Sequence, residues 1–422
     1  MNENKLPKGW GIKRLGELGK VFTGNTPPTN DISNYGNEFL FVSPADLGNG
    51  KYITQTEKKL SEKGFLISRK FPKGSVLFTC IGSTIGKIGV ASEDLTSNQQ
   101  INAIVVDERN NNEFLYYQLE KNAEIIKSLA GEQAVPIINK SQFESVKLLF
   151  PPLPEQKAIA QILSTADDAI HSTEKLIAQK ELRKKWLMQQ LLTGKKRLLN
   201  DELGMMNYEW KPIRIGNIFR FIKSYSIYRD GLQNDSDDPI FCIHYGDIHT
   251  KYGSSFLDFD IQKNIPQLID NDLSIEVDHF LQDGDIVMAD ASEDYEGVGT
   301  SIEIKNLKGK KAIGGLHTIV LRPDKKTISL DFTAYFFASE TVKNTLRKYA
   351  TGTSVYSVTK TQIHNLSFII PNSLKEQTAI AQVLQATDKE INLLKAKAEK
   401  LREQKKWLMQ VLLTGKVRLK IN

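Results

Sequence analysis

One segment of this chain occurs twice, with the copies about half a chain length apart. Residues 155–198 read EQKAIAQILSTADDAIHSTEKLIAQKELRKKWLMQQLLTGKKRL, and residues 376–419 read EQTAIAQVLQATDKEINLLKAKAEKLREQKKWLMQVLLTGKVRL. The copies align without a gap at a constant offset of 221, and 22 of the 44 aligned positions are identical. An internal repeat of this length indicates two similar halves in tandem, which constrains the architecture before any single motif is considered.

Each copy has the pattern of a long helix. Apolar residues recur at steps of three, four or seven, as in the seam of a coiled coil, and in the second copy they are Ile380, Leu384, Ile391, Leu394, Ala398, Leu401 and Leu408. Both copies close at Thr-Gly, at Gly194 and Gly415. Each helix is predicted to run about 38 residues, or roughly 57 Å. Such a helix needs a partner for its seam, and we expect the other copy to be that partner.

Two regions of domain size accompany the helices. Both contain short β-like runs separated by turn glycines, for example Phe39–Val42 and Ile240–Ile243. Both open with a Trp followed by a hydrophobic-Gly pair, and both are predicted to form one amphipathic helix late in the domain, around Phe114–Leu129 and Phe332–Tyr349. Both close with a Lys-x-Gln element before a strand and a Pro. We therefore predict an α+β chain in the order domain (1–150), helix (151–198), domain (205–371) and helix with C-terminal tail (372–422). The domains agree in framework positions and differ elsewhere, which suggests that they recognise two different things.

Composition restricts the class of protein. No run of eighteen apolar residues is present, so we expect no membrane-spanning segment, and the N-terminus lacks an apolar signal core. The two cysteines, Cys80 and Cys242, suit a reduced compartment, so a cytoplasmic location is expected. The net charge of +6 and the pI near 8.9 agree with nucleic-acid binding without proving it.

Several motifs resemble those of Type I restriction–modification specificity subunits. The segment from Pro151–Gln156 to Lys195 resembles their first conserved helical region, and Glu376–Lys416 resembles their distal one. Trp10 to Pro27, Gly82–Lys87 and Ser97–Gln100 resemble elements of their target-recognition domains. The second domain departs from this pattern, because Ile222–Tyr225 replaces the Gly-x-Thr-Pro element and Ala291–Glu296 replaces Gly-Ser-Thr-Ile-Gly-Lys.

The resemblance implies a non-catalytic subunit that reads double-stranded DNA. Two target-recognition domains would be separated by an antiparallel coiled coil of the two repeats, related by a pseudo-two-fold axis. Two methyltransferase subunits would dock on this scaffold for adenine methylation of a bipartite target, and restriction subunits would add cleavage. S-adenosylmethionine is then expected on the methyltransferase partner, with ATP and Mg on the restriction partner. No cofactor or metal is expected in this chain.

Candidate DNA-binding residues come from the same motifs. Gly82–Lys87 is no P-loop, since three residues separate the glycines and Ile88 follows the lysine; it is either a turn that presents Lys87 to phosphate or a plain hairpin connection. Carboxamides at Asn98–Gln100 could read adenine, or form a polar turn. The candidates are Asn25, Thr26, Ser83, Thr84, Lys87, Asn98, Gln99 and Gln100 in the first domain, and Lys223, Tyr225, Tyr228, Arg229, His244, Tyr295 and His317 in the second.

Identical Lys-Lys-Trp-Leu-Met-Gln strings in the two helices are candidates for subunit docking. They contribute Lys184, Lys185, Trp186, Lys405, Lys406 and Trp407. A solvated helix face or contact with DNA phosphate would also explain the lysines, and the tryptophans are expected to pack at the end of the coiled coil. Asp290, Glu293, Asp294 and Glu296 could hold a divalent ion or accept from cytosine.

The sequence shows no amino-methyltransferase motif and no cofactor fingerprint. Two competing interpretations are a stand-alone adaptor that binds proteins or membranes through its coiled coil, and an enzyme with an unrecognised site.

Overall fold

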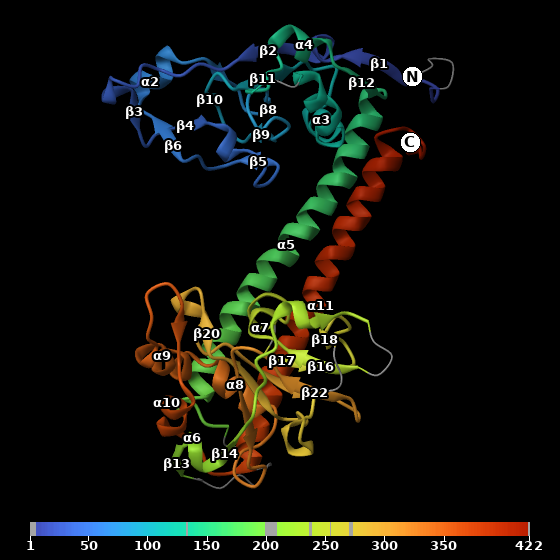
Figure 1. Cartoon of the computed structure of the whole chain (residues 1–422). Coiled ribbons are helices and arrows are strands. Elements are labelled where there is room, and N and C mark those ends of the chain that lie inside the picture. The colour runs from blue at the N-terminus through green and yellow to red at the C-terminus, as the bar shows by residue number, and fades with distance from the viewer. Residues whose placement is uncertain are drawn as a thin grey trace. The chain divides into compact units, whose positions relative to one another are not determined.

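The computed structural model describes residues 6–131, 134–198, 209–235, 239–253, 255–269 and 273–420. Two compact units are present (Figure 1): unit 1 combines Met1–Lys175 with Lys395–Asn422, and unit 2 is Leu176–Leu394. Each unit thus contains one α+β domain and part of each long helix. The domain boundaries predicted at residues 150 and 371 remain a prediction. The domain limits predicted at residues 1, 205 and 422 lie outside the described residues.

The two copies of the repeat form helices of equal length. These are α5 (Leu153–Leu191) and α11 (Leu374–Leu412), each 39 residues long, in agreement with the seam pattern. Within each unit they run antiparallel, as interhelical ion pairs show. The pairs are Glu174–Arg402 and Asp167–Lys405 in unit 1, and Lys180–Glu390 and Lys184–Asp388 in unit 2.

The repeated Thr-Gly positions have a steric cause. Gly194 and Gly415 have φ angles of 71° and 69°, a region that favours glycine. A Cβ atom at Gly194 would lie 3.2 Å from the ring of Trp210, and one at Gly415 would lie 3.2 Å from the ring of Trp10. The chain therefore turns tightly after each helix and passes directly over a tryptophan.

The N-terminal domain, in unit 1, contains two five-stranded sheets. The first has the order β2 (Gly19–Thr23), β11 (Ile101–Val106), β8 (Val76–Thr79), β9 (Ile88–Ala91), β5 (Tyr52–Ile53). The second has the order β3 (Tyr35–Gly36), β6 (Lys58–Leu60), β4 (Phe39–Val42), β10 (Leu95–Ser97), β7 (Lys70–Phe71). A separate ribbon pairs β1 (Gly11–Arg14) with β12 (Lys147–Phe150). The α-helices are α1 (Leu15–Leu18), α2 (Glu62–Ile67), α3 (Asn112–Lys127) and α4 (Lys140–Ser145), and the 3₁₀ turns are η2 (Ile32–Asn34), η3 (Pro44–Asp46) and η4 (Ser128–Ala130).

The C-terminal domain, in unit 2, contains a five-stranded and a four-stranded sheet. Their orders are β14 (Phe219–Ile222), β23 (Thr318–Pro323), β19 (Ile286–Ala289), β21 (Ser301–Lys305), β17 (Phe256–Asp258), and β15 (Leu232–Gln233), β18 (Gln267–Leu268), β16 (Ile240–Ile243), β22 (Lys311–Gly314). Two ribbons pair β13 (Trp210–Arg214) with β25 (Ser367–Pro371) and β20 (Ala291–Ser292) with β24 (Tyr356–Ser357). The helices are α6 (Ile215–Ile218), α7 (Tyr245–Thr250), α8 (Phe332–Ala338), α9 (Glu340–Tyr349) and α10 (Lys360–Asn365), with 3₁₀ turns η6 (Arg229–Gly231), η7 (Val277–His279) and η8 (Tyr295–Gly297).

The two domains share one strand order. In both five-stranded sheets the opening strand pairs with the strand that enters the late helices, and the last strand pairs parallel to its neighbour (β5 with β9, β17 with β21). The second sheets match through the parallel pairs β4–β10 and β16–β22. The α+β class and the duplicated domain are therefore confirmed. The single late helix expected over residues 332–349 is instead two, because Ser339 caps a new helix by accepting from the Val342 N–H.

A buried glutamate at the start of each long helix binds an arginine beyond the end of the other. Glu155 accepts from Arg418 Nε at 2.7 Å and Nη2 at 2.8 Å, and from Trp10 Nε1 at 3.2 Å. In unit 2, Glu376 accepts from Arg197 at 2.6 and 2.8 Å. A bidentate guanidinium satisfies a carboxylate that burial would otherwise destabilise.

The glutamine that follows each glutamate binds the domain itself. Gln156 donates to Pro151 O and accepts from Asn111 N, both within 2.9 Å. Gln377 makes the equivalent bonds to Pro371 O and Ser329 N, at 2.9 and 2.7 Å. The repeated Glu-Gln pair therefore fixes the domain to the helix that follows it.

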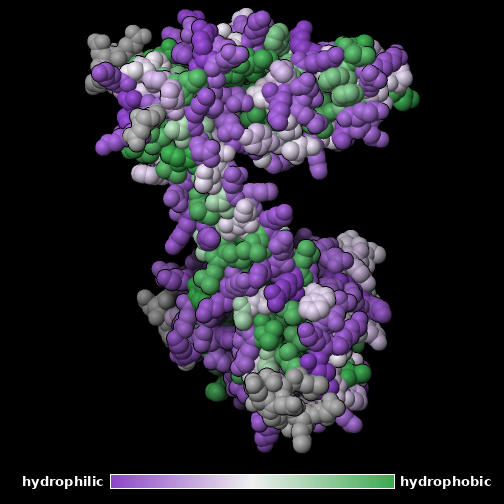
Figure 2. Space-filling model, turned by 180° about the vertical axis from the view of Figure 1, so that it is seen from behind, coloured by the Kyte–Doolittle hydropathy of each residue, from purple (hydrophilic) through white to green (hydrophobic). Residues whose placement is uncertain are grey.

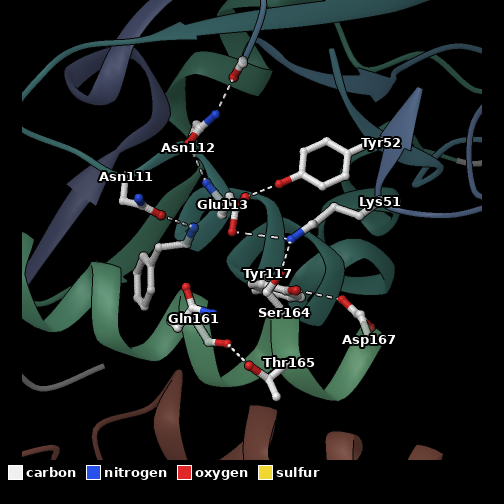
Figure 3. Close-up of polar contacts among 12 residues, drawn as sticks. Lys51, Tyr52, Asn111, Asn112, Glu113, Tyr117, Gln161, Ser164, Thr165 and Asp167 are labelled. Atoms are coloured by element: carbon white, nitrogen blue, oxygen red, sulfur yellow. Dashed lines mark hydrogen bonds and ion pairs between the residues drawn. The ribbon is translucent and has the colours of Figure 1, made fainter. Parts of the chain in front are cut away.

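A second junction joins each domain to both helices. Tyr117 of α3 donates to Asp167 at 2.6 Å (Figure 3). Asp167 also binds Lys405 of α11 at 2.7 Å. In unit 2, Tyr335 of α8 donates to Asp388 at 2.7 Å, and Lys184 of α5 binds the same carboxylate at 2.5 Å.

The N-terminal domain has a further contact at this junction. Lys51 donates to Ser164 of α5 at 2.6 Å and pairs with Glu113 at 3.3 Å, and Glu113 also accepts from the Tyr52 hydroxyl (Figure 3). The side chain of Lys51 is 7% exposed. The domain therefore contacts α5 along more than one turn.

Three apolar side chains of η2 and α2 are exposed in the N-terminal domain: Ile32, Leu66 and Ile67. Figure 2 shows hydrophobic groups scattered over a mainly hydrophilic surface of this domain. The core of the domain does not use these side chains.

Lys405→Met should destabilise unit 1 by about 1–3 kcal/mol, because Glu120 and Asp167 lose their partner. Burial opposes the charge on Lys405, but the two carboxylates outweigh it and raise the pKa of this amine. Chemical denaturation of the full chain measures the loss. Lys406→Met is the matched control, since Lys406 is exposed, and should change stability by less than about 0.5 kcal/mol. Equal effects of the two substitutions would contradict this role for Lys405.

Candidate nucleic-acid interface

Three segments of the N-terminal domain meet at the end of β10. Thr26 donates to the Gln99 side chain at 2.7 Å, which joins the loop after β2 to the loop after β10. Cys80 N donates to Gln100 O at 2.8 Å, which adds the loop after β8. The structure thus brings together motifs that the sequence placed about 20 to 75 residues apart.

The carboxamides of this cluster are ordered by one another. Asn98 donates from Nδ2 to Gln100 Oε1 at 3.0 Å, and its Oδ1 accepts from Gln100 N at 3.1 Å. Gln99 is exposed, whereas Asn98 and Gln100 are half-buried. Carboxamides held in this way present donors and acceptors in a defined geometry, as recognition of a base edge requires.

The turn Gly82–Lys87 has a different neighbourhood. Gly82 and Gly86 have φ angles of 91° and 100°, so the glycines permit the turn. Lys87 lies along Gly48, and Ser83, Thr84 and Lys87 line a pocket of about 450 Å³ that Glu120 and Glu124 also line. Gly82 approaches the carboxamide cluster, since a Cβ atom at this glycine would lie 3.8 Å from Gln100 Nε2. The carboxylates make this pocket less favourable for phosphate than the turn sequence suggested.

Two cations near the cluster were missed in the sequence. Arg69 and Lys140 each lie 6.0 Å from the ring centroid of Phe22, and Arg69 donates to Thr23 O at 2.7 Å. Asn25 Oδ1 accepts from Arg69 N at 2.6 Å. Lys140 belongs to the Lys-x-Gln element found in both halves, a signal that could have identified it. Cations at such positions can contact the DNA phosphates while the neighbouring amides contact the bases.

In the C-terminal domain an aromatic cluster occupies the corresponding place. The ring of Tyr245 has its centroid 4.7 Å from that of His244 and 5.3 Å from that of His317. His317 is paired with Asp290 at 3.1 Å. His244 accepts at Nδ1 from Gly246 N at 3.2 Å, and burial together with nearby Arg229 lowers the pKa of its imidazole.

Arg229 adds charge to this face. It binds the fully buried Asp247 at 2.8 Å, and Lys251 binds the same carboxylate at 2.8 Å. Burial raises the pKa of Asp247, but the bonds from Arg229 and Lys251 outweigh burial and leave the pKa below its usual range. Two partly exposed cations share one buried carboxylate, so this group of three side chains carries net positive charge.

The other predicted residues of this domain are dispersed. Lys223 lies 5.2 Å from the ring centroid of Tyr225, whose hydroxyl bonds to His279 at 2.9 Å. Tyr228 is exposed. Tyr295 donates to Arg347 O at 3.0 Å and packs on Tyr356, so the structure does not bring it into the Tyr245 cluster.

The docking candidates divide into two groups. Lys184 and Lys405 take part in the ion pairs between the helices, which explains why they are duplicated. Lys185 and Lys406 are exposed. The expectation that Trp186 and Trp407 pack at the end of the coiled coil is wrong, since their side chains are 49% and 56% exposed. Packing within the chain therefore does not account for the repeated tryptophan.

Among the residues that the structure describes, no group of three or more His, Cys, Asp or Glu side chains is arranged to hold a metal ion. Asp290 instead pairs with His317, Asp294 caps Gly297, and Glu296 pairs with Arg347. None of the helices in the described part of the chain combines the length and the apolar character that a membrane crossing needs.

Comparisons with known proteins agree on one family. A family model described as Type I restriction modification DNA specificity domain matches residues 7–181 and 207–403. The specificity subunit of the Type I restriction enzyme MjaVIII of Methanocaldococcus jannaschii is 27% identical, over 100% of this chain and 96% of that protein.

Solved structures show the same fold. The S subunit of a Type I restriction–modification system from M. genitalium has a TM-score of 0.56 and 14% identity, and the match covers 100% of this chain and 99% of that one. A chain from a study of complex assembly and conformational transition in the type I R-M system has a TM-score of 0.61 and 16% identity, with 98% and 100% covered.

Proposed function

Because the chain belongs to the family of Type I restriction–modification specificity subunits, we propose that each of its domains reads one half of a bipartite DNA target. The chain is a non-catalytic subunit with two tandem specificity domains, and it works with methyltransferase and restriction subunits on DNA. The proposal rests on one observation. The two domains share a strand order, but they carry different side chains at the same structural position. The cluster after β10 presents carboxamides, and the corresponding cluster beside α7 presents imidazoles and a tyrosine.

Within this proposal the N-terminal half-site is read by Asn98, Gln99 and Gln100, with Asn25 and Thr26 supporting them. Arg69 and Lys140 contact phosphate. In the C-terminal domain His317 and Tyr245 face the bases, and Arg229 and Lys223 contact phosphate. We further propose a cytoplasmic location, where the DNA and the partner subunits are found.

The first test is methylation sequencing of the genome of a methylation-free host. Co-expression of this chain with the methyltransferase subunit of its own system should produce a bipartite motif with methylated adenine in both halves. Neither protein alone should produce it. Methyl transfer by the chain alone would instead indicate an enzyme, and failure of the two proteins to co-purify would favour the adaptor interpretation.

We also propose that the length of the helix pair sets the gap between the half-sites. The two helices have equal length, and their register is held by interhelical ion pairs. A helix is a stiff spacer of about 1.5 Å per residue, so it transmits a defined separation.

Inserting seven residues into both helices, after Lys175 and after Leu394, tests this spacing. The insertion adds about 10 Å, which corresponds to about three base pairs at roughly 3.4 Å each. The methylated motif should gain about three base pairs in its gap and keep both half-sites. The same insertion in α5 alone should abolish the motif, because the ion pairs lose register. An unchanged gap with both insertions would contradict the proposal.

Two equivalent docking sites, one on each long helix, form the last part of the proposal. Trp186 with Lys185 and Trp407 with Lys406 occur at the same position of the repeat and are exposed in both units. An exposed tryptophan beside a cation is a frequent centre of protein–protein binding energy. The duplication supports two methyltransferase subunits per chain.

The double variant Trp186→Ala/Trp407→Ala should weaken methyltransferase binding by more than about tenfold, as expected for an interface hot spot. Each single variant should retain one methyltransferase per chain by native mass spectrometry. Stability should change by less than about 0.5 kcal/mol, because both side chains are half exposed. Leu182→Ala and Leu393→Ala are matched controls, since both leucines are exposed on the same helices but are not repeated. Full assembly of the double variant would overturn these docking sites.

A further inference from the structure

His317 and Gln100 occupy the same structural position in the two domains. Gln100 precedes β11, and its carbonyl accepts from Cys80 N at 2.8 Å; His317 precedes β23, and its carbonyl accepts from Asp290 N at 3.1 Å. The residues opposite them correspond too, because Cys80 O accepts from Ile138 N at 2.8 Å and Asp290 O accepts from Val358 N at 2.9 Å. One framework position therefore carries a carboxamide in one domain and an imidazole in the other.

The backbone at His317 is held in a costly conformation. Its φ angle is 53°, in the left-handed region that residues other than glycine rarely adopt. Such strain persists where surrounding contacts impose it, and it is concentrated at functional sites. Here the contacts are the backbone bond from Asp290 and the edge of the Tyr245 ring. The side chain is nevertheless 51% exposed, so the strain does not serve burial of the ring.

The hydrogen bond to Asp290 determines the hydrogen-bonding face of the imidazole. A carboxylate only accepts, so the 3.1 Å contact requires that Nδ1 carry a hydrogen and donate to Asp290 Oδ1. A neutral ring in this tautomer has Nε2 as an acceptor. In the major groove the groups that donate to an acceptor are the amino groups of adenine N6 and cytosine N4.

From this geometry we propose that His317, oriented by Asp290, reads the amino group of one adenine or cytosine in the half-site of the C-terminal domain. The inference rests on the proposed function and adds the residue and the class of base. His317 is the reading residue, and Asp290 is a positioning residue that selects the tautomer. Arg229, Lys251 and Lys223 supply positive charge on the same domain for contact with phosphate.

Two variants, expressed in full length with the methyltransferase subunit in the methylation-free host, test this assignment. His317→Gly removes the ring, and glycine adopts a φ of 53° without strain, so folding is preserved. One position of the C-terminal half-site that is adenine or cytosine for the wild type should become degenerate. The preference at that position should fall from about tenfold or more to about twofold or less. The other half-site and the gap should stay unchanged.

Asp290→Asn is the sharper variant. The amide can donate to Nδ1, which moves the ring hydrogen to Nε2 and turns the outward face from acceptor to donor. The same position should then admit guanine or thymine, whose major-groove edges offer acceptors. A purely structural role of Asp290 would lower methylation at all sites without changing the base that is preferred. His171→Ala, at an exposed histidine of α5, is the control and should leave the whole motif unchanged.

The outcomes separate this inference from the function on which it rests. A wild-type bipartite motif that both variants keep at every position would overturn the role of His317 and leave the proposed function intact. Relaxation at a guanine or thymine of the wild-type motif would overturn the acceptor assignment. Absence of any motif with the wild-type pair would overturn both.

Discussion

Two buried carboxylates, Glu155 and Glu376, are the contacts on which the duplicated architecture depends. Each begins a long helix, and each is neutralised by an arginine that follows the end of the other helix. Leaving either carboxylate buried without its arginine would cost several kcal/mol, which is a large part of the free energy of unfolding of a typical domain. The pairing is therefore obligatory, and it makes each domain depend on residues from both halves of the sequence. The compact units consequently do not follow the linear order of the chain.

Much of the fold could be predicted because its signals are local and occur twice. The helix seam and the Thr-Gly ends predicted two helices of about 38 residues, and α5 and α11 each have 39 residues. Short β-like runs such as Ile240–Ile243 coincide with strands. The lysines were harder to interpret, because nothing local distinguishes Lys405 from Lys406. Only the antiparallel register places Lys405 against Asp167 and Glu120. The late helix of the C-terminal domain was predicted as one element because the capping role of Ser339 depends on its backbone conformation.

The candidate interface shows the same contrast between residues that the local sequence identifies and residues that meet only in the folded chain. Residues within one motif, Asn98 to Gln100, could be proposed from sequence because their polar character is visible there. Arg69 and Phe22 could not, since they come from separate segments and meet only after the sheets form. Lys140 joins them in the fold, and only the repeated Lys-x-Gln element signals it in the sequence. The pair of Asp290 and His317 was divided in the sequence between an acidic run and an isolated histidine. Strand register joins them, and it does so at the position where the other domain has Cys80 and Gln100.

The two long helices resemble each other more closely than the two domains do, and these contacts explain the difference. A helix position such as Lys184 or Lys405 must satisfy the same carboxylate geometry in both units, so its chemistry is constrained twice. Trp186 and Trp407 are exposed and take no part in these ion pairs, although Lys196 lies 5.7 Å from the ring centroid of Trp186. Under the proposed docking, their identity follows from one kind of partner met twice. A reading position has the opposite requirement. Under the proposed function, Gln100 and His317 need the same backbone contacts but different side-chain chemistry, because a bipartite target with two different halves must be read differently by the two domains.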